Sequence, residues 1–159
     1  MCGDEQCVAS ICLPDRPARP GAACWVGGWG LEDYDDEIVP DSLKSVGLNI
    51  FSEDYTKAKT KKSFYSTMQF DNEFAAGQPD FDGDGLTDPG RDSCSGDSGG
   101  PVVCREENSL VVYGLVSWGQ SCAKRGLPSA NAQVYAAMDW ITKMTGISAK
   151  VTKSIRNKL

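Results

Sequence analysis

The sequence predicts an all-β protein, a barrel or a sandwich, with a helix at its C-terminal end. Short apolar or β-branched runs recur along the 159 residues, separated by segments rich in Gly, Pro and Asp. Near the end, Trp140, Ile141, Met144 and Ile147 have a spacing close to one helical face. Short strands between turns, with helix only at the end, are typical of barrels and sandwiches.

The elements are expected in a definite order. Residues 1–23 are predicted to be irregular, because Pro14, Pro17 and Pro20 interrupt any regular element. Strands are predicted at 24–30, 43–50 with an irregularity near Gly47, 66–70, 102–103, 110–118 and 134–137. The segments between them are predicted as a solvated loop or helix face at 57–62, a turn at 74–77, a hairpin turn at 105–108, a loop at 119–129 and a basic tail at 148–159.

Composition limits the class of protein. The chain is 40% hydrophobic and 24% charged, which is typical of one domain with its own core. Its net charge of -6, from 16 basic and 22 acidic residues, argues against a nucleic-acid partner. No run of about 18 apolar residues occurs, so no membrane span is predicted. Residues 1–7 lack a basic region followed by an apolar core, so we expect no signal peptide there.

The seven cysteines indicate disulfide bonds. They are spread widely and lack the paired short spacings of a zinc site, and the chain contains no histidine. Disulfides persist in oxidising compartments, so we expect an extracellular, secreted protein. The odd number leaves at least one cysteine without a partner inside the chain.

An acidic stretch at residues 80–91 partly matches a calcium-binding loop. Oxygen ligands at alternate positions and a glycine for a sharp turn are the features of such loops. The matching positions are Asp80, Asp82, Asp84, Leu86 through its carbonyl, and Asp88. The last position should be a bidentate glutamate and is Arg91 instead, which favours a solvated acidic loop. Calcium therefore remains a candidate ligand, and no cofactor is required.

The strongest motif is the segment at residues 92–101, which reads DSCSGDSGGP. Small neighbours around Ser98 let a carbonyl carbon approach the hydroxyl, and free backbone N–H groups can bind the oxyanion that forms. The Gly-x-Ser-x-Gly pattern also fits the nucleophile elbow of α/β-hydrolases, which lies between a strand and a helix. Because Gly99 and Pro101 follow at once and are poor helix formers, the elbow interpretation fails.

This segment resembles, almost letter for letter, the active-site segment of the trypsin-like (chymotrypsin-family) serine proteases. Residues 11–30 resemble the same family, with Ile-Cys-Leu-Pro followed by Cys-Trp-Val-x-Gly-Trp-Gly, and so do residues 113–141. The resemblance runs from about residue 11 to residue 147. It is weak between residues 31 and 88.

The resemblance implies the second six-stranded antiparallel barrel of a double-barrel fold, with a C-terminal helix. Residues 24–147 would form this barrel and helix, and residues 1–23 would be the segment between the barrels. Most of the first barrel would be missing. The implied disulfides are Cys24 with Cys104 and Cys94 with Cys122, whereas Cys12 has Cys2 and Cys7 as candidate local partners.

The resemblance also implies catalytic roles. Ser98 would be the nucleophile that forms an acyl-enzyme, and the backbone N–H groups of Gly96 and Ser98 would form the oxyanion hole. Asp97 would pair with the new N-terminal amine when a zymogen is cleaved.

For substrate binding, the resemblance places Asp92 at the base of the specificity pocket, where a buried carboxylate selects Arg or Lys side chains. Ser129 stands where a pocket-wall glycine is usual and would narrow the pocket, and Asn131 replaces a common aromatic residue at its back. The strand edge expected to hold the substrate backbone is Ser117, Trp118 and Gly119.

The implied function is that of a secreted trypsin-like endopeptidase that cleaves proteins or peptides after Arg or Lys. With no histidine anywhere, the usual general base is absent, so we expect a fragment that lacks the catalytic His and Asp and is inactive alone. Its expected partners are substrates and the missing N-terminal barrel of the same protein. The alternative is a catalytically dead homologue that acts as a binding module.

Overall fold

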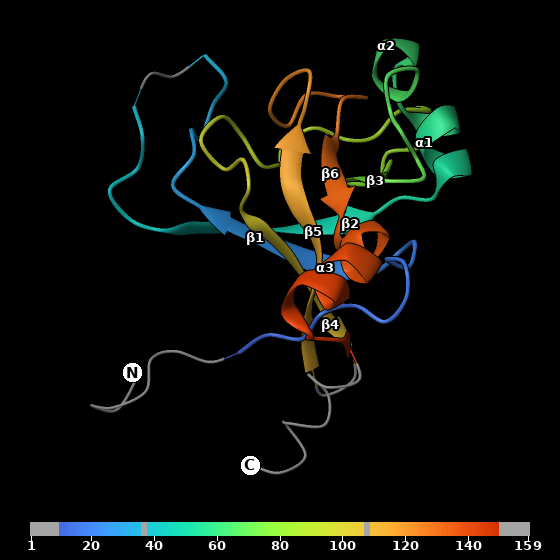
Figure 1. Ribbon diagram of the computed structural model, residues 1–159. Coiled ribbons are helices and arrows are strands. Elements are labelled where there is room, and N and C mark those ends of the chain that lie inside the picture. Colours follow the sequence, from blue (N-terminus) through green and yellow to red (C-terminus); the bar gives the residue numbers. More distant parts are fainter. Residues whose placement is uncertain (1–9, 36–37, 107–108, 150–159) are drawn as a thin grey trace.

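The computed structural model describes residues 10–35, 38–106 and 109–149, and within them six antiparallel strands close into a barrel (Figure 1). Neighbouring strands follow the order β1-β2-β3-β6-β5-β4. The strands are β1 (Ala23–Gly28), β2 (Lys44–Ile50), β3 (Glu73–Gly77), β4 (Pro101–Glu106), β5 (Ser109–Trp118) and β6 (Ser129–Gln133). The predicted fold class, a six-stranded antiparallel barrel with a C-terminal helix, is confirmed.

The prediction that helix occurs only at the end is wrong. Two short helices, α1 (Glu53–Lys59) and α2 (Lys62–Tyr65), lie together at one end of the barrel, apart from α3 (Figure 1). The N-cap of α1 is Ser52, whose hydroxyl accepts a hydrogen bond from the Tyr55 amide at 3.0 Å. The expected C-terminal helix is α3 (Met138–Thr145), and no helix among the described residues is long and apolar enough to cross a membrane.

Three further element predictions are wrong. Residues 66–70 form turns instead of a strand, and the turn predicted at 74–77 is part of β3, because Phe74, Ala75 and Ala76 are buried and β3 pairs with β6. Residues Val134–Ala137 form the 3-10 helix η1, and the last strand is β6. Residues 150–159 of the predicted tail, residues 107–108 of the predicted hairpin turn, and Cys2 and Cys7 lie outside the described residues.

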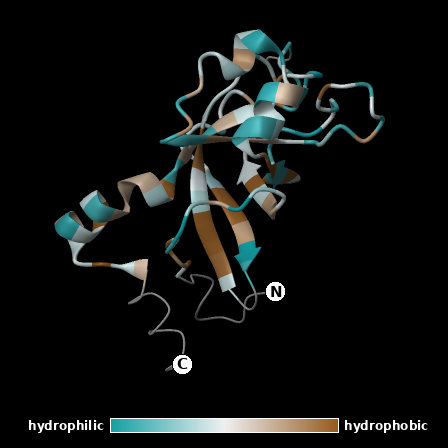
Figure 2. Cartoon of the chain, turned by 90° about the vertical axis from the view of Figure 1, so that its right-hand side faces the viewer, coloured by the Kyte–Doolittle hydropathy of each residue, from teal (hydrophilic) through white to brown (hydrophobic). Residues whose placement is uncertain are grey.

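The barrel interior is filled by buried side chains from β1 to β5, and Figure 2 shows the strongest hydrophobic colour on some of the strands. The Cys24–Cys104 disulfide joins β1 to β4 at residues that already face each other in the ladder. Its loop of 80 residues corresponds to at most about 4.5 kcal/mol of stabilisation in the chain-entropy estimate.

The segment before β1 is attached to the outside of this barrel. The Cys12 amide donates to the Leu110 carbonyl at 3.1 Å, and the Val112 amide donates to the Cys12 carbonyl at 3.0 Å. Glu106 accepts hydrogen bonds from Arg16 and from the Tyr113 hydroxyl. Burial and this carboxylate raise the pKa of Tyr113, so the phenol stays protonated as the donor.

A second apolar cluster lies under α1 and α2 and supports the end of β5. Its fully buried centre is Phe64 of α2, whose ring centroid lies 5.3 Å from that of Trp118. The indole N–H of Trp118 donates to Glu73 Oε1 at 2.8 Å. The inserted helices therefore fix the orientation of Trp118.

We predict that Phe64→Ala lowers the free energy of unfolding by about 3–5 kcal/mol, because it removes a fully buried ring and leaves a cavity. The matched control is Phe81→Ala, since Phe81 is 71% exposed and should change stability by less than about 0.5 kcal/mol. Urea unfolding of both variants measures the difference. Equal midpoints would contradict the packing described.

Candidate active site

The loop before β4 presents Ser98 to solvent. It is attached to β5 by the two residues that follow the serine: the Gly99 amide donates to the Val116 carbonyl at 2.8 Å, and the Val116 amide donates to the Gly100 carbonyl at 2.9 Å. Gly96 has a φ of 101°, and a Cβ there would lie 3.0 Å from the Gly30 Cα. Only glycine fits that position without strain.

Two backbone donors next to Ser98 are free to bind an anion. The amides of Gly96 and Ser98 donate to no other residue in the described part of the chain. Asp97, between them, is held in a turn by its own amide, which donates to the Cys94 carbonyl at 3.0 Å. Such uncommitted N–H groups beside a serine hydroxyl can stabilise an oxyanion.

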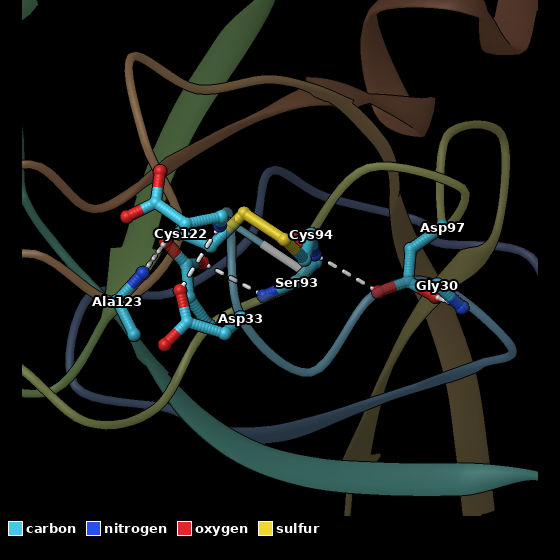
Figure 3. Close-up of a disulfide and its surroundings, with 9 residues drawn as sticks. Gly30, Asp33, Ser93, Cys94, Asp97, Cys122 and Ala123 are labelled. Carbon is cyan, nitrogen blue, oxygen red and sulfur yellow. Dashed lines mark hydrogen bonds between the residues drawn. A yellow bond between two sulfur atoms is a disulfide. The ribbon is translucent and has the colours of Figure 1, made fainter. Parts of the chain in front are cut away.

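The Asp97 side chain points toward Gly30 and Cys94 (Figure 3). Its Oδ1 accepts from the Gly30 amide at 2.8 Å and its Oδ2 from the Cys94 amide at 2.9 Å. A Cβ at Gly28 would lie 2.0 Å from Oδ1, and one at Gly30 would lie 2.6 Å from the carboxyl carbon. The two glycines of β1 and its following loop therefore make room for this carboxylate.

Asp97 borders a cavity of about 270 Å³ that also reaches Asp92, Lys44 and Arg91. Its walls include Gly28, Gly30 and both cysteines of the Cys94–Cys122 disulfide. The cavity thus places a partly buried carboxylate next to two glycines, where the wall is backbone.

A second, smaller cavity of about 210 Å³ opens beside Ser98. It is the candidate specificity pocket, and Trp118, Gly119 and Tyr34 contribute to its walls together with the same disulfide. Six of its lining residues are serines, namely Ser93, Ser95, Ser98, Ser117, Ser121 and Ser129. The wall is therefore rich in hydroxyl groups.

Five residues of this lining were not among the predicted site residues, namely Tyr34, Ser93, Ser95, Val116 and Ser121. Ser93 and Ser121 adjoin Asp92 and Cys122, so their positions in the chain could have indicated them. Tyr34 comes from an acidic loop far away in sequence, and no sequence signal indicated it. Ser121 is buried, and its hydroxyl has no partner among the residues that the structure describes.

Asp92 lies behind the specificity pocket, where it borders the larger cavity and is absent from the lining of the smaller one. Its Oδ1 accepts from the Ser93 amide at 2.9 Å and its Oδ2 from the Ala123 amide at 3.3 Å. Burial raises the pKa of Asp92 to about 7, and hydrogen bonds from Ser129, Ala123 and Ser93 oppose this rise. The carboxyl therefore carries a proton through most of the mildly acidic range.

Ser129 connects Asp92 to the pocket. It lines the pocket and is hydrogen-bonded to Asp92, and its hydroxyl donates to the Ala76 carbonyl at 3.0 Å. The Asn131 Nδ2 group donates to the Ser129 hydroxyl at 3.3 Å, while Asn131 Oδ1 is buried without a partner among the described residues. Asn131 does not line the pocket itself.

The end of β5 offers an unpaired edge. The pairing of β5 with β6 is irregular between Val116 and Trp118, so Ser117 is left out of the ladder and is exposed. A bulge of this kind exposes backbone groups that can pair with an added extended chain. Ser117, Trp118 and Gly119 all lie beside the pocket.

The Cys94–Cys122 disulfide joins the Ser98 loop to the loop after β5 (Figure 3). With Cys24–Cys104, it completes the two pairs that the resemblance implied. Its loop of 28 residues corresponds to at most about 3.6 kcal/mol in the chain-entropy estimate. Because it borders both cavities, it separates Asp97 from the specificity pocket.

The acidic loop brings three of its four predicted carboxylates together. Oxygen atoms of Asp80, Asp82 and Asp88 lie within 4.8 Å of one another. Asp84 instead forms an ion pair with Arg125, and Lys59 Nζ donates to Asp80 Oδ2 at 2.8 Å. These cations hold the pKa values of Asp84 and Asp80 below the ordinary range.

Comparison with known proteins gives a consistent match. The family model described as Trypsin matches residues 4–141. The chain is 33% identical over 149 residues to the urokinase-type plasminogen activator of Gallus gallus, covering 92% of this chain and 31% of that protein. It is 36% identical over 134 residues to putative trypsin-6 of Homo sapiens, covering 84% and 47%. It is 35% identical over 135 residues to trypsin-3 of Salmo salar, covering 85% and 50%.

We predict that Asp92→Asn changes how stability depends on pH. The folded-state pKa of about 7 lies above the ordinary value of 3.8, so the folded protein binds the proton more tightly than the unfolded chain. As pH rises from about 4 to 7, Asp92 therefore lowers the free energy of unfolding progressively, by up to about 4 kcal/mol in total. Above pH 7 this loss of stability no longer changes with pH. Relative to Asp92→Asn, the unsubstituted chain should become less stable over this window. Urea midpoints at pH 4.5, 6 and 8 measure the effect, and a pH-independent difference would contradict it.

Proposed function

Because this chain belongs to the trypsin family of serine proteases, we propose that it carries the nucleophile, the oxyanion hole and the specificity pocket of a secreted endopeptidase. The observation that carries this proposal is the exposed Ser98, flanked by uncommitted amides at the mouth of a pocket. The two disulfides support an extracellular location, because such bonds persist in oxidising compartments.

In the proposed reaction, the Ser98 hydroxyl attacks the scissile carbonyl and forms an acyl-enzyme that water then hydrolyses. The amides of Gly96 and Ser98 would donate to the oxyanion, a contribution worth several kcal/mol to the transition state. The backbone at Ser117 would pair with the substrate main chain and hold the carbonyl near the nucleophile.

The reaction also needs a general base to accept the proton of Ser98, and the sequence contains no histidine. The chain spans half or less of the length of the three relatives compared. We therefore propose that the histidine and the aspartate that orients it are supplied from outside these 159 residues, by an N-terminal barrel. Helix α3 supports this docking, since Trp140 and Met144 are each 65% exposed and form an apolar surface with Ile147.

Asp97 is proposed to be the zymogen switch. It borders the larger cavity, and its two oxygens are already oriented by the Gly30 and Cys94 amides. An N-terminal ammonium entering this cavity would pair with the carboxylate and stabilise the turn that presents Gly96 and Ser98.

For substrate preference, we propose cleavage after Arg or Lys. Asp92 supports this, since a carboxyl buried behind the pocket would ionise when a cation enters and would then be paired with it. Trypsin-family relatives make protein or peptide substrates the natural class.

A second candidate is a catalytically dead homologue that binds a protein or peptide partner through the same pocket. The absence of histidine favours it. The two candidates differ in whether Ser98 becomes reactive once a base is supplied.

We predict that the 159-residue chain alone hydrolyses a lysyl or arginyl ester no faster than its Ser98→Ala variant, because no base accepts the serine proton. A chimera with the N-terminal half of Salmo salar trypsin-3 placed before residue 11 should instead show turnover that Ser98→Ala abolishes. Spectrophotometric ester hydrolysis measures both. A folded but inert chimera would favour the binding-module candidate, whereas Ser98-dependent turnover by the chain alone would refute the need for an external base.

We also propose that the acidic loop binds calcium weakly. The clustered oxygens of Asp80, Asp82 and Asp88 suit a hard cation, and extracellular calcium modules bind in the range of about 10⁻⁴–10⁻³ M. The Lys59 ammonium occupies part of this site, so calcium would have to displace it from Asp80.

Titration calorimetry tests this competition. We expect Asp82→Ala to abolish calcium binding and Lys59→Ala to strengthen it, because the second change removes the competing ammonium. Asp139→Ala, which removes a carboxylate outside the loop, is the control. Equal titrations of the chain and its Asp82→Ala variant would exclude the site.

A further inference from the structure

We propose that the segment before β1, residues 10–22, is protected against cleavage by proteases of the specificity proposed for this chain, including its own active form. This inference rests on the proposed function, because it concerns cleavage after Arg or Lys. It is carried by the two arginines of this segment, by the residue that follows each of them, and by the carboxylate that binds both.

The segment has the exposure of a protease substrate. Residues 17–19 form neither helix nor strand, and Pro17, Arg19 and Pro20 are exposed. Proteases bind accessible, extended chain as an added strand, and irregular surface segments are the preferred sites of cleavage. Protection therefore has to come from the residues of the segment and their contacts.

Each arginine of the segment precedes a proline. Arg16 and Arg19 are the only basic residues among residues 1–43, and they are followed by Pro17 and Pro20. No other Lys or Arg in the sequence has a proline after it. The combination of arginine and proline is thus confined to the segment before β1.

Proline makes the bond before it a poor substrate. Cleavage requires the leaving nitrogen to turn its developing lone pair toward a general acid and to accept a proton. In proline this nitrogen carries the ring carbon Cδ in place of hydrogen, and Cδ crowds the backbone of the preceding residue. The ring therefore hinders both the attack of a serine hydroxyl on the arginine carbonyl carbon and the departure of the nitrogen.

Glu106, at the end of β4, adds a second protection. Its Oε2 accepts a hydrogen bond from Arg16, and its Oε1 accepts one from Arg19 Nη2 at 3.3 Å. A protease that cleaves after arginine must take the guanidinium into its own pocket, so each side chain would first have to leave this carboxylate.

The second protection is stronger for Arg16 than for Arg19. The Arg16 side chain is 42% exposed and that of Arg19 is 63% exposed. The Nε atom of Arg16 is buried and has no partner among the residues that the structure describes. We therefore expect the bond after Arg16 to depend on both protections and the bond after Arg19 to depend mainly on Pro20.

The protected segment is one whose cleavage would separate the two parts of the proposed enzyme. Ser98 lies in this chain, and the histidine is proposed to come from an N-terminal barrel. A cut after Arg16 or Arg19 would break the covalent connection between them. The two parts would then lose the high effective concentration that a short connection provides.

Limited proteolysis of the 159-residue chain by added trypsin, with the fragments identified by mass spectrometry, tests the inference. We expect no cleavage after Arg16 or Arg19, either in the native chain or after unfolding by reduction and alkylation. In the unfolded chain, the bonds after Lys124 and Arg125 should be cut, because neither precedes a proline. These two bonds show that the protease is active under the same conditions.

Variants separate the two protections. Pro20→Ala should allow cleavage after residue 19 in the native chain. Pro17→Ala should allow cleavage after residue 16 in the unfolded chain, and the native chain should be cut there only when Glu106→Gln is added. The matched control is Pro40→Ala, which removes a proline that follows Val39 and should create no new cleavage site.

Cleavage of the unsubstituted chain after Arg16 or Arg19, at the rate found after Lys124, would overturn the proposal. So would intact bonds at these positions in the unfolded Pro17→Ala and Pro20→Ala variants. Native cleavage of Pro17→Ala that does not change with Glu106→Gln would reject the second protection.

These outcomes are separate from failure of the proposed function, which is decided by Ser98-dependent turnover of the chimera. Because the protease is added, the test gives a result even if the chimera is inert. An active chimera that carries Pro17→Ala and Pro20→Ala should cleave itself in this segment, whereas the chimera with both prolines should remain intact there.

Discussion

The arrangement around Ser98 depends on the inward position of one carboxylate. Asp97 binds the amides of Gly30 and Cys94, and so connects the end of β1 to the loop that carries the serine. This position exists only because residues 28 and 30 are glycines, since a Cβ at either would overlap the carboxylate. With Asp97 directed inward, the amides of its two neighbours, Gly96 and Ser98, remain uncommitted.

Two further connections hold the same loop against the barrel. On one side the Cys94–Cys122 disulfide attaches it to the loop after β5, and on the other the amides of Gly99 and Val116 attach it to β5 itself. Strand β5 is in turn supported at its end by Trp118, which contacts Phe64 and Glu73. The helices inserted between β2 and β3 therefore contribute to the pocket although none of their residues lines it.

The sequence predicted the structure best at residues 92–101, where the same few residues determine both the backbone conformation and the candidate site. Strand and turn patterns predicted an all-β barrel or sandwich, and the resemblance carried by residues 92–101 implied the six-stranded barrel, both disulfides and the grouping of Ser98, Gly96 and Asp97. Strand β3 was not predicted, since Phe74 to Gly77 is a short apolar run whose partner, β6, is distant in sequence. At residues 57–62 the prediction left a solvated loop or a helix face open, and the start of α1 was missed although Ser52 is a good N-cap residue. The ion pair that removes Asp84 from the acidic cluster depends on Arg125, which no local pattern indicates.

The groups of residues 92–98 and the proposed general base differ in where the chain can carry them, for a physical reason. The Gly96 and Ser98 amides, the Asp97 carboxylate and Asp92 lie within seven residues of one another, so one turn geometry can set all of them together. A general base has a different requirement, because it must approach the Ser98 hydroxyl from the solvent side while the substrate occupies the pocket. A group rooted in the same turn would be directed by the same hydrogen bonds toward the barrel, as Asp97 is. This is the reason for proposing a base carried by a separate structural unit, for which the exposed Trp140 and Met144 of α3 are the proposed packing surface.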